Sequence, residues 1–242
     1  MRITICESSF DLSVQAARFI AELVKTNPTA TLCLASGHTP LGAFERLVEM
    51  ADAGLVDFSR CHFIGLDEWV GIPSSAEGSC RYFLDNYFFK KLNIPEAQLH
   101  FFDGMATDPE AECRKMDDVI IYLGGLDLML VGIGLNGHIA LNEPGTPWNL
   151  HSHVGDLDEM TVTVGQKYFS GKTQLTKGIT LGLQYLREAK LPLLMASGEA
   201  KAPVIRQALE GEVTELFPAS IFQTLEQGVV MLDKAAAGRL GA

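Results

Sequence analysis

The chain is poor in features that mark several protein classes. It has five cysteines, an odd and scattered set without a CxxC pair, which argues against a disulfide framework and a zinc site. Its 19 lysines and arginines are outnumbered by 30 aspartates and glutamates, giving a net charge of −11. Nucleic acids and anionic membrane surfaces both attract basic faces. We therefore expect no metal, no nucleic-acid partner and no membrane partner.

Other patterns are missing as well. No apolar run is long enough to cross a bilayer, and the first residues resemble a short strand rather than a signal peptide. Neither a GxxxxGK[ST] loop nor a GxGxxG turn after a strand is present, so nucleotide binding is not favoured. No repeat and no low-complexity linker divides the chain. These absences predict one domain spanning residues 1–242, located in a reducing cytoplasm.

Short apolar runs alternate with segments of helical periodicity. Apolar residues make up 47% of the chain, which suits a domain with a large core. Runs of several apolar residues without alternation are typical of strands buried on both faces of a parallel sheet. We expect an α/β fold with an open, doubly wound, mostly parallel sheet flanked by helices. The expected strands are residues 3–6, 31–35, 61–66, 99–102, 126–133, 191–196 and 228–232.

Four polar motifs each follow the carboxyl end of a different expected strand. In open α/β sheets that edge is where ligands bind. Four motifs at one edge predict a single site built from distant parts of the chain. The motifs are SGHTP (36–40), DEW (67–69), NGH (136–138) and SGEAK (197–201).

The SGHTP turn opens a helix and is a candidate anion site. Amides at a helix N-terminus, together with the helix dipole, favour a bound anion such as phosphate. Ser36 and Thr39 add hydroxyl donors beside Gly37 and His38. The alternative is a simple helix cap, because Thr39 followed by Pro40 also makes a good N-cap and first helical residue.

The SGEAK turn repeats the strand–turn–helix pattern and places Lys201 in the first helical turn. A lysine is unfavourable against the positive end of the helix dipole, and a bound anion would explain its position. We interpret Lys201 as a phosphate ligand, with a solvated lysine as the alternative.

The DEW motif puts two carboxylates, Asp67 and Glu68, side by side at a strand end. Successive side chains of a strand face opposite ways, so one can enter a cleft while the other braces the backbone. A carboxylate in a partly dry pocket can be tuned into a general base. The alternative is a helix cap or a surface pair.

The glycine-rich stretch GIGLNGHIALNEPG, residues 132–145, places Asn136, His138 and Glu143 in one turn. Histidine can accept and donate a proton near neutral pH, and Glu143 can fix its tautomer. We expect His138 to be catalytic rather than structural. A metal site is disfavoured because no other histidine has HxxxH spacing with it.

The aromatic residues carry weaker signals. Phe83, Tyr87, Phe88 and Phe89 follow helical spacing and are expected in the core. Trp69 and Trp148 flank the two catalytic turns, and they either wall the pocket or pack in the core.

These motifs match a known family. LASGHTPLG, LDEWVG and GIGLNGHIALNEPG, in this order, resemble the amino-sugar-6-phosphate deaminase/isomerase family over essentially the whole chain. LTKGITLGL and the sequence around GSCRYFLDNYF are similar to its galactosamine-6-phosphate branch. The 6-phosphogluconolactonases are more distant relatives with the same fold, a phosphate turn and a GH loop.

The resemblance implies a Rossmann-like sheet and an aldose–ketose isomerisation with loss of ammonia, without metal or cofactor. The substrate would be a sugar phosphate, either glucosamine 6-phosphate or galactosamine 6-phosphate. Asp67 would move a proton from C2 to C1, and His138, oriented by Glu143, would assist ring opening. The phosphate would be held by Ser36, Gly37, His38, Thr39 and Lys201.

Three departures from the family pattern stand out. Asn136 replaces the aspartate of many deaminases, which would remove one charged partner of the imidazole. Lys167 lies near the place where an arginine often contacts phosphate. The C-terminal extension tied to hexamers and allosteric activation is not seen before Ala242, so we expect a monomer or a small homo-oligomer.

Three alternatives remain open. The enzyme could be specific for galactosamine 6-phosphate and give tagatose 6-phosphate, with the discrimination at C4 made by residues 146–165. It could be a 6-phosphogluconolactonase-type hydrolase, which the DEW segment and the NEPG continuation argue against. A sugar-phosphate-sensing domain is the non-enzymatic alternative.

Overall fold

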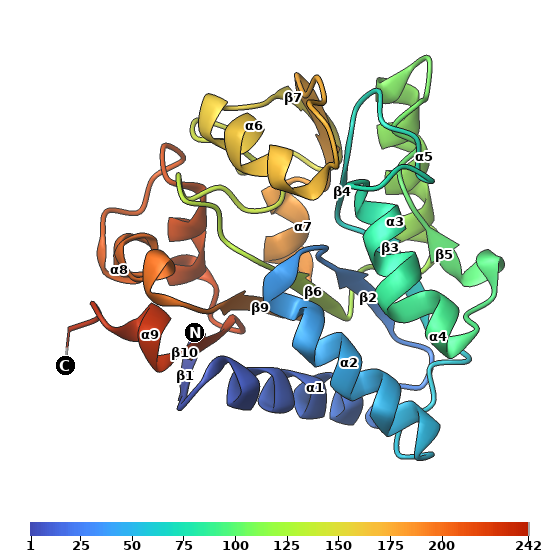
Figure 1. Cartoon of the computed structure of the whole chain (residues 1–242), viewed down its shortest axis with the longest axis horizontal. Helices are drawn as coiled ribbons and strands as arrows, with labels where there is room; N and C mark the ends of the chain where they lie inside the picture. Colours follow the sequence, from blue (N-terminus) through green and yellow to red (C-terminus); the bar gives the residue numbers. More distant parts are fainter. Residues whose placement is uncertain (242) are drawn as a thin grey trace.

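The computed structural model describes residues 1–241, and its centre is a seven-stranded sheet in which all strand pairs are parallel (Figure 1). This confirms the expected sheet. Six of the strands lie at the expected runs, and the run at 99–102 forms a strand over its first two residues alone. In spatial order the strands are β1 (Arg2–Cys6), β10 (Val229–Asp233), β9 (Leu191–Ala196), β6 (Leu128–Val131), β2 (Thr31–Leu34), β3 (His62–Gly65) and β5 (Leu99–His100).

Helices cover both faces of this sheet. Alternation along β2 shows how: Leu32 and Leu34 pack into the cluster that includes α1 and α2, whereas Cys33 belongs to the cluster on the opposite face. Burial on both faces explains why the strands are uniformly apolar rather than alternating. The helices on one face are α1 (Ser9–Thr26) and α2 (His38–Asp52); those on the other are α5 (Pro109–Tyr122), α7 (Leu183–Glu188) and α8 (Ala202–Glu210).

Shorter helical segments complete the chain. None of the helices within residues 1–241 is long and apolar enough to cross a membrane. The short segments are α3 (Cys80–Leu84), a π-helical turn (Asp85–Phe89), α4 (Lys90–Leu92), α6 (Glu159–Gly165), α9 (Lys234–Ala237) and 3-10 turns at Glu96–Gln98, Gln166–Tyr168, Glu199–Lys201 and Pro218–Thr224.

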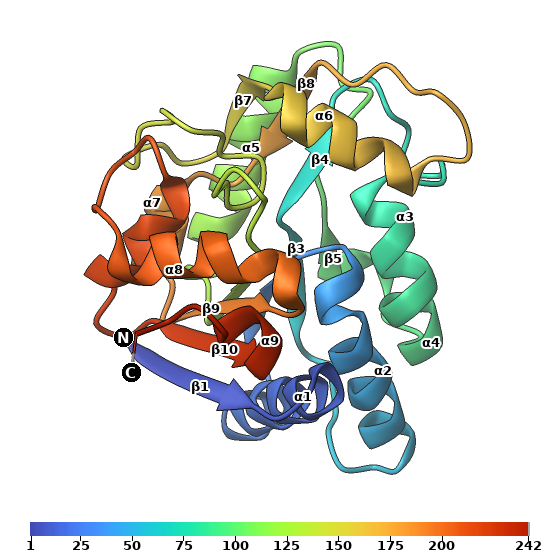
Figure 2. The same ribbon diagram turned by 60° about the vertical axis from the view of Figure 1, so that its left-hand side comes forward.

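A second, three-stranded sheet was not expected from the sequence. Its strands pair antiparallel in the order β4 (Asp67–Trp69), β8 (Lys177–Thr180), β7 (His153–Asp156). β4 begins directly beyond the carboxyl end of β3, with only Leu66 between them. The DEW motif is therefore a strand rather than a loop. The small sheet and α6 stand beyond the carboxyl edge of the main sheet (Figure 2).

The strand order brings the four polar motifs together. They follow β2, β3, β6 and β9, which are neighbours in the sheet. The order in which strands are added to the sheet reverses between β2 and β6. After β2, the strands β3 and β5 are added on one side, whereas β6, β9 and β10 are added on the other. Such a switch point leaves a crevice at the carboxyl edge. The predicted convergence of the motifs is confirmed.

Candidate active site

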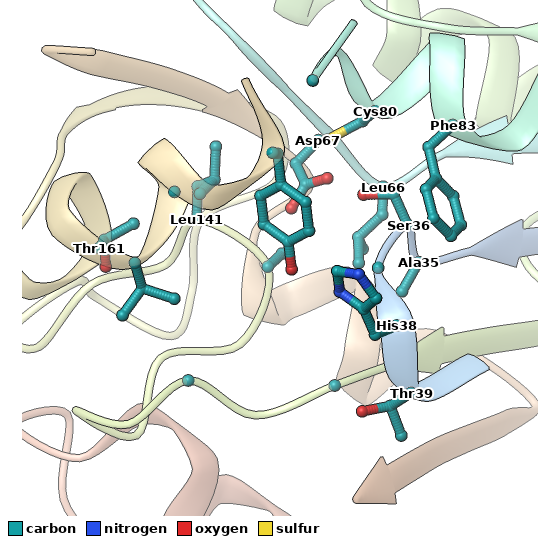
Figure 3. Close-up of a pocket in the computed structure, with 18 of the residues that line it drawn as sticks. Ala35, Ser36, His38, Thr39, Leu66, Asp67, Cys80, Phe83, Leu141 and Thr161 are labelled. Carbon is teal, nitrogen blue, oxygen red and sulfur yellow. The ribbon is translucent and has the colours of Figure 1, made fainter. Parts of the chain in front are cut away.

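A cavity of about 410 Å³ lies at this carboxyl edge (Figure 3). Two of the predicted residues, Asn136 and Glu143, are not in its wall and lie behind His138. The predicted residues that line it are Ser36, Gly37, His38, Thr39, Asp67, His138, Lys167 and Lys201. We call the part formed by residues 36–40, Lys167 and Lys201 the anion end. We call the part formed by Asp67, Cys80, His138 and Thr161, with Glu143 behind His138, the proton-transfer end.

The anion end is centred on the start of α2. The helix begins at His38, and its N-cap is Gly37, whose φ of 114° is strained for any residue with a side chain. No side chain caps the helix. The alternative of a Thr39 cap followed by Pro40 at the first helical position is therefore wrong, because the helix starts before Thr39. The first turn offers free backbone amides beside the cavity, as an anion site requires.

Two lysines complete this end. Lys201 lies in the 3-10 turn directly before α8, and its Nζ donates a hydrogen bond to the carbonyl of Ile133 at 2.5 Å. Burial, and next the charge of Lys167, lower the pKa of Lys201. The structure thus brings Lys167 and Lys201 to one place. Two neighbouring cations with few counter-charges are best satisfied by an anion.

Asp67 is buried at the proton-transfer end, with 8% of its surface exposed. Burial raises its pKa to about 6, while a hydrogen bond from Cys80 and the charge of His138 act in the opposite direction. Desolvation disfavours the carboxylate, so a buried aspartate becomes a stronger base. A pKa near 6 suits a group that must take up and return a proton near neutral pH.

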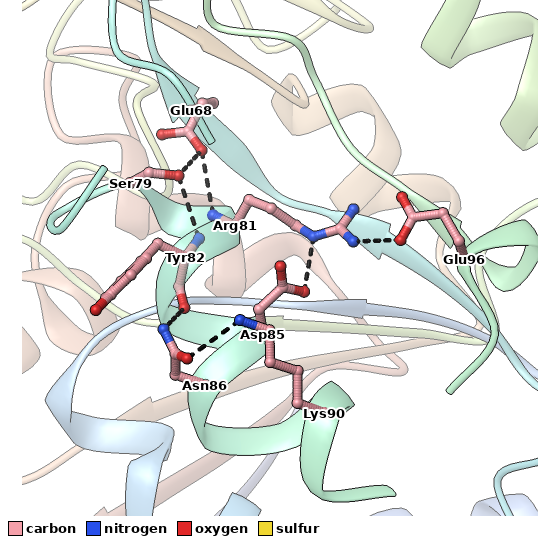
Figure 4. A network of polar contacts seen from close by, with 8 residues as sticks. All are labelled: Glu68, Ser79, Arg81, Tyr82, Asp85, Asn86, Lys90 and Glu96. Carbon is pink, nitrogen blue, oxygen red and sulfur yellow. Dashed lines mark hydrogen bonds and ion pairs between the residues drawn. The ribbon is translucent and has the colours of Figure 1, made fainter. Parts of the chain in front are cut away.

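Glu68, the next residue of β4, holds the start of α3 (Figure 4). Its carboxylate accepts the Ser79 hydroxyl at 2.6 Å, and Ser79 in turn caps α3 by accepting from the backbone of Tyr82. Asp67 lines the cavity, whereas Glu68 bonds to the start of α3, so the two side chains face opposite ways along β4. Glu68 also accepts three backbone N–H groups, from Trp69, Cys80 and Arg81, at 3.0–3.1 Å.

His138 is held by a small polar network. Its Nδ1 lies 3.4 Å from Oε2 of Glu143 and 3.0 Å from the hydroxyl of Thr161. The ring packs directly against Gly134, where a Cβ would overlap it. Although burial acts to raise it, the hydrogen bond and charge of His138 keep the pKa of Glu143 below its ordinary value. A charged Glu143 can therefore favour one imidazole tautomer.

Asn136 hydrogen-bonds to the groups around the imidazole rather than to the ring itself. Its side-chain amide donates to Oε2 of Glu143 at 2.9 Å, and its carbonyl oxygen accepts the backbone N–H of His138 at 3.1 Å. Asn136 thus fixes the carboxylate relative to the turn that carries the histidine.

Several cavity residues were missed or misplaced by sequence reasoning. Phe88 and Phe89 are buried in the core as expected, and Phe83 packs against the same cluster while also lining the cavity. Tyr87 lines the cavity and is 39% exposed, so its assignment to the core was wrong. Trp69 lines the cavity and Trp148 packs against the main core. The missed residues near the polar groups are Cys80, Thr161 and Tyr168.

Two signals could have pointed to these residues. Cys80 begins the first helix after the DEW motif. Thr161 lies in α6, within residues 146–165, the segment that was expected to form a wall of the cleft. Neither signal fixes which side chain faces inward, because that depends on how the small sheet and α6 fold over the edge.

Comparison with known proteins points in the same direction. A glucosamine-6-phosphate deaminase of Lachnoclostridium phytofermentans is 41% identical over 92% of this chain and 95% of its own length. A solved structure described as a monomeric glucosamine-6-phosphate deaminase of the NagB superfamily has a TM-score of 0.95 and 34% identity, covering 99% of this chain and all of that one.

The fold itself is more widely shared. The 6-phosphogluconolactonase of Trypanosoma brucei has a TM-score of 0.78 at 21% identity, covering 99% of this chain and 98% of that one, which shows a common fold alone. Residues 8–231 match the family described as glucosamine-6-phosphate isomerases/6-phosphogluconolactonase. The motifs of the chain gather in one cavity, and its relatives are similar over nearly its whole length. The chain therefore belongs to the glucosamine-6-phosphate isomerase/6-phosphogluconolactonase family.

Proposed function

We propose that this protein is an amino-sugar-6-phosphate deaminase that converts glucosamine 6-phosphate and water to the ketose 6-phosphate and ammonia. One observation carries the proposal: a buried carboxylate with a pKa near 6 shares a cavity with an oriented imidazole and a basic helix N-terminus. The names of the most similar relatives support the same reaction.

The phosphate binds at the anion end. The amides of the first turn of α2 and the hydroxyls of Ser36 and Thr39 donate hydrogen bonds to its oxygens. Although the chain as a whole has a net charge of −11, Lys167 and Lys201 supply positive charge at this end of the cavity. This contact fixes the distal end of the sugar and directs its first two carbons toward Asp67 and His138.

His138 opens the sugar ring. Its free nitrogen takes the proton of the anomeric hydroxyl and delivers it to the ring oxygen, which leaves an open-chain aldehyde. The charge of Glu143 stabilises the imidazolium during this transfer, and the Thr161 hydroxyl contacts both Nδ1 and Glu143.

Asp67 then isomerises the open chain. Its carboxylate removes the proton from C2, which is acidic beside the aldehyde, while the aldehyde oxygen takes a proton from the C2 ammonium group, giving an enolamine. Asp67 then returns its proton to C1. The C2–N bond becomes an imine, water adds to C2, and ammonia leaves to give the C2 ketone. A carboxylate with a pKa near 6 is matched to both proton transfers.

We propose the gluco epimer as the substrate because the named relatives at 36–41% identity are glucosamine-6-phosphate deaminases. Met160, Thr161, Val164 and Gly165 of the segment 146–165 line the cavity. They are our candidates for the wall that distinguishes the C4 epimers. The galactosamine-specific and lactonase alternatives are less favoured.

We further propose that the chain acts as one domain and as a monomer in a reducing cytoplasm. Residues of both sheets line a single cavity, and the structurally similar deaminase is described as monomeric. All five cysteines are buried and unpaired.

The proposal is tested by measuring ammonia release from glucosamine 6-phosphate and galactosamine 6-phosphate, in parallel with hydrolysis of 6-phosphogluconolactone. We expect turnover of the gluco substrate, a lower kcat/KM for the galacto epimer, and no lactone hydrolysis above background. Lactone hydrolysis without ammonia release would contradict the proposed reaction. A higher kcat/KM for the galacto epimer would contradict only the substrate assignment.

A further inference from the structure

Cys80 lies beside the proposed base, and neither the sequence nor the proposed reaction assigns it a role. It is the first residue of α3, is 8% exposed and lines the cavity. Figure 3 shows its sulfur next to Asp67, with Ser36 beside both of them. The thiol is therefore the group through which α3 contacts Asp67.

The position of Cys80 is fixed from the opposite side of the DEW motif. Glu68 accepts the backbone N–H of Cys80 at 3.1 Å, and the Ser79 hydroxyl, which caps α3, donates to the same carboxylate at 2.6 Å. Glu68 follows Asp67 directly in β4, so the strand that carries Asp67 also binds the start of α3. The backbone of Cys80 is thus tied to the strand that carries the base.

The thiol accepts one hydrogen bond and donates another. Ser36 donates to the sulfur, and the thiol donates to the carboxylate of Asp67. Burial, followed by the charges of Asp67 and Glu68, raises the pKa of Cys80 well above its ordinary value. The sulfur therefore keeps its proton at neutral pH and acts as a donor.

We propose that Cys80 is a positioning residue: its thiol orients the Asp67 carboxylate and links it to Ser36 of the anion end. This inference rests on the proposed function, in which Asp67 is the base. Among the described residues, no other hydrogen-bond donor to the Asp67 side chain is found. A carboxylate that must reach both C1 and C2 needs a fixed orientation, because small displacements are costly in catalysis.

The other groups around Asp67 do not replace the thiol. Cys33 of β2 and Tyr168, beyond α6, both have pKa values raised by burial, with a further contribution from the charge of Asp67. His138, in the loop after β6, acts on Asp67 through its charge. An altered pH dependence in a Cys80 variant is therefore attributable to the lost thiol when these three residues are kept.

The inference is tested with Cys80→Ala, Cys80→Ser and the control Cys113→Ala, which removes a buried core thiol that does not line the cavity. For Cys80→Ala we expect kcat to fall about 5- to 30-fold, the effect of losing one weak hydrogen bond to a charged group, with KM changed less than about 3-fold. The acidic limb of kcat/KM should move to higher pH, because the carboxylate loses a donor that stabilises it. Cys113→Ala should match the parent in both readouts.

Cys80→Ser keeps a donor and should restore kcat to within about 3-fold of the parent, with an acidic limb no higher than that of the parent. The Asp67 carboxyl resonance, titrated by NMR without substrate, should show the same shifts. An unchanged kcat and an unchanged titration in Cys80→Ala would overturn the inference, as would a serine variant as impaired as the alanine variant. Full turnover by Asp67→Asn would instead overturn the assignment of the base.

Discussion

The two ends of the cavity are built on different principles. The anion end uses backbone amides at the start of α2 and two lysines, one of them the half-buried Lys201. The proton-transfer end uses buried side chains, and burial itself sets the pKa of Asp67. Charge attraction tolerates small displacements, whereas proton transfer depends on orientation and on a dry environment. Changes at the first end should alter substrate binding, and changes at the second should alter turnover.

The largest effect is expected for Asp67→Asn. The amide cannot take up the C2 proton, so ammonia release should fall by about 10²–10⁴-fold or more. Binding of glucosamine 6-phosphate should change less than about 3-fold, because the anion end is intact. Turnover and calorimetric binding measured on the same preparation check both parts. Loss of binding in this variant would contradict the assignment of binding to one end of the cavity and turnover to the other.

Lys201→Met should have the next largest effect. It removes a charge but keeps most of the side-chain volume, so KM should rise about 30- to 100-fold while kcat changes little, as expected for loss of a charge-assisted hydrogen bond. Lys234→Met is the matched control, because Lys234 pairs with Glu7 on the surface. Steady-state kinetics separate the two constants. A fall in kcat at constant KM would place Lys201 among the proton-transfer groups.

Proton transfer should also fail as the pH is lowered. Asp67 acts as the carboxylate, and its pKa of about 6 means that it becomes protonated below that pH. The value of kcat/KM should fall about tenfold per pH unit below pH 6. A profile measured from pH 5 to 8 checks this, and a flat acidic side would show that the base is not Asp67.

Glu68→Gln should act on the fold rather than on the chemistry. The amide would face the Arg81 N–H or the Ser79 hydroxyl with its own donors, which costs about 1–3 kcal/mol of unfolding free energy. Urea denaturation measures this loss. Asp85→Asn, at a part-exposed partner of Arg81, is the control and should cost less. Equal losses would mean that Glu68 is not the group that fixes α3.

The neighbouring Asp67→Asn should change stability with the opposite sign. The folded-state pKa is raised, so the favourable contribution of protonated Asp67 exists below about pH 4 and is lost as the pH rises through about 6. At pH 8 the buried charge is a cost, and its removal should stabilise the protein by about 1–3 kcal/mol. Urea denaturation at pH 8 and pH 4 should show a gain only at the higher pH.

The sequence was most informative where one local rule determines the structure. Uniformly apolar runs predicted the parallel strands, and the glycines beside His138 predicted an exposed turn at a strand end. Alternation along a strand was enough to separate Asp67 from Glu68. Each of these features depends on residues close together in the chain.

Features that depend on distant packing were not predictable. β4 has three residues, too few to show a period, and it pairs with β8 more than a hundred residues away. Phe83 and Tyr87 have the same spacing as core residues, and it is the packing of distant segments that makes both line the cavity. Thr161 and Cys80 were missed for the same reason, since a hydroxyl or thiol gains a role only through its neighbours.

The order of β9, β6, β2 and β3 has a consequence for how such a protein changes over time. Each strand delivers its own loop to the shared edge, and each loop is anchored separately in the sheet. One loop can therefore be replaced while the remaining three keep their positions. A scaffold of this kind can therefore take on a different loop, and with it different side chains at the edge, without loss of the sheet that holds the other three.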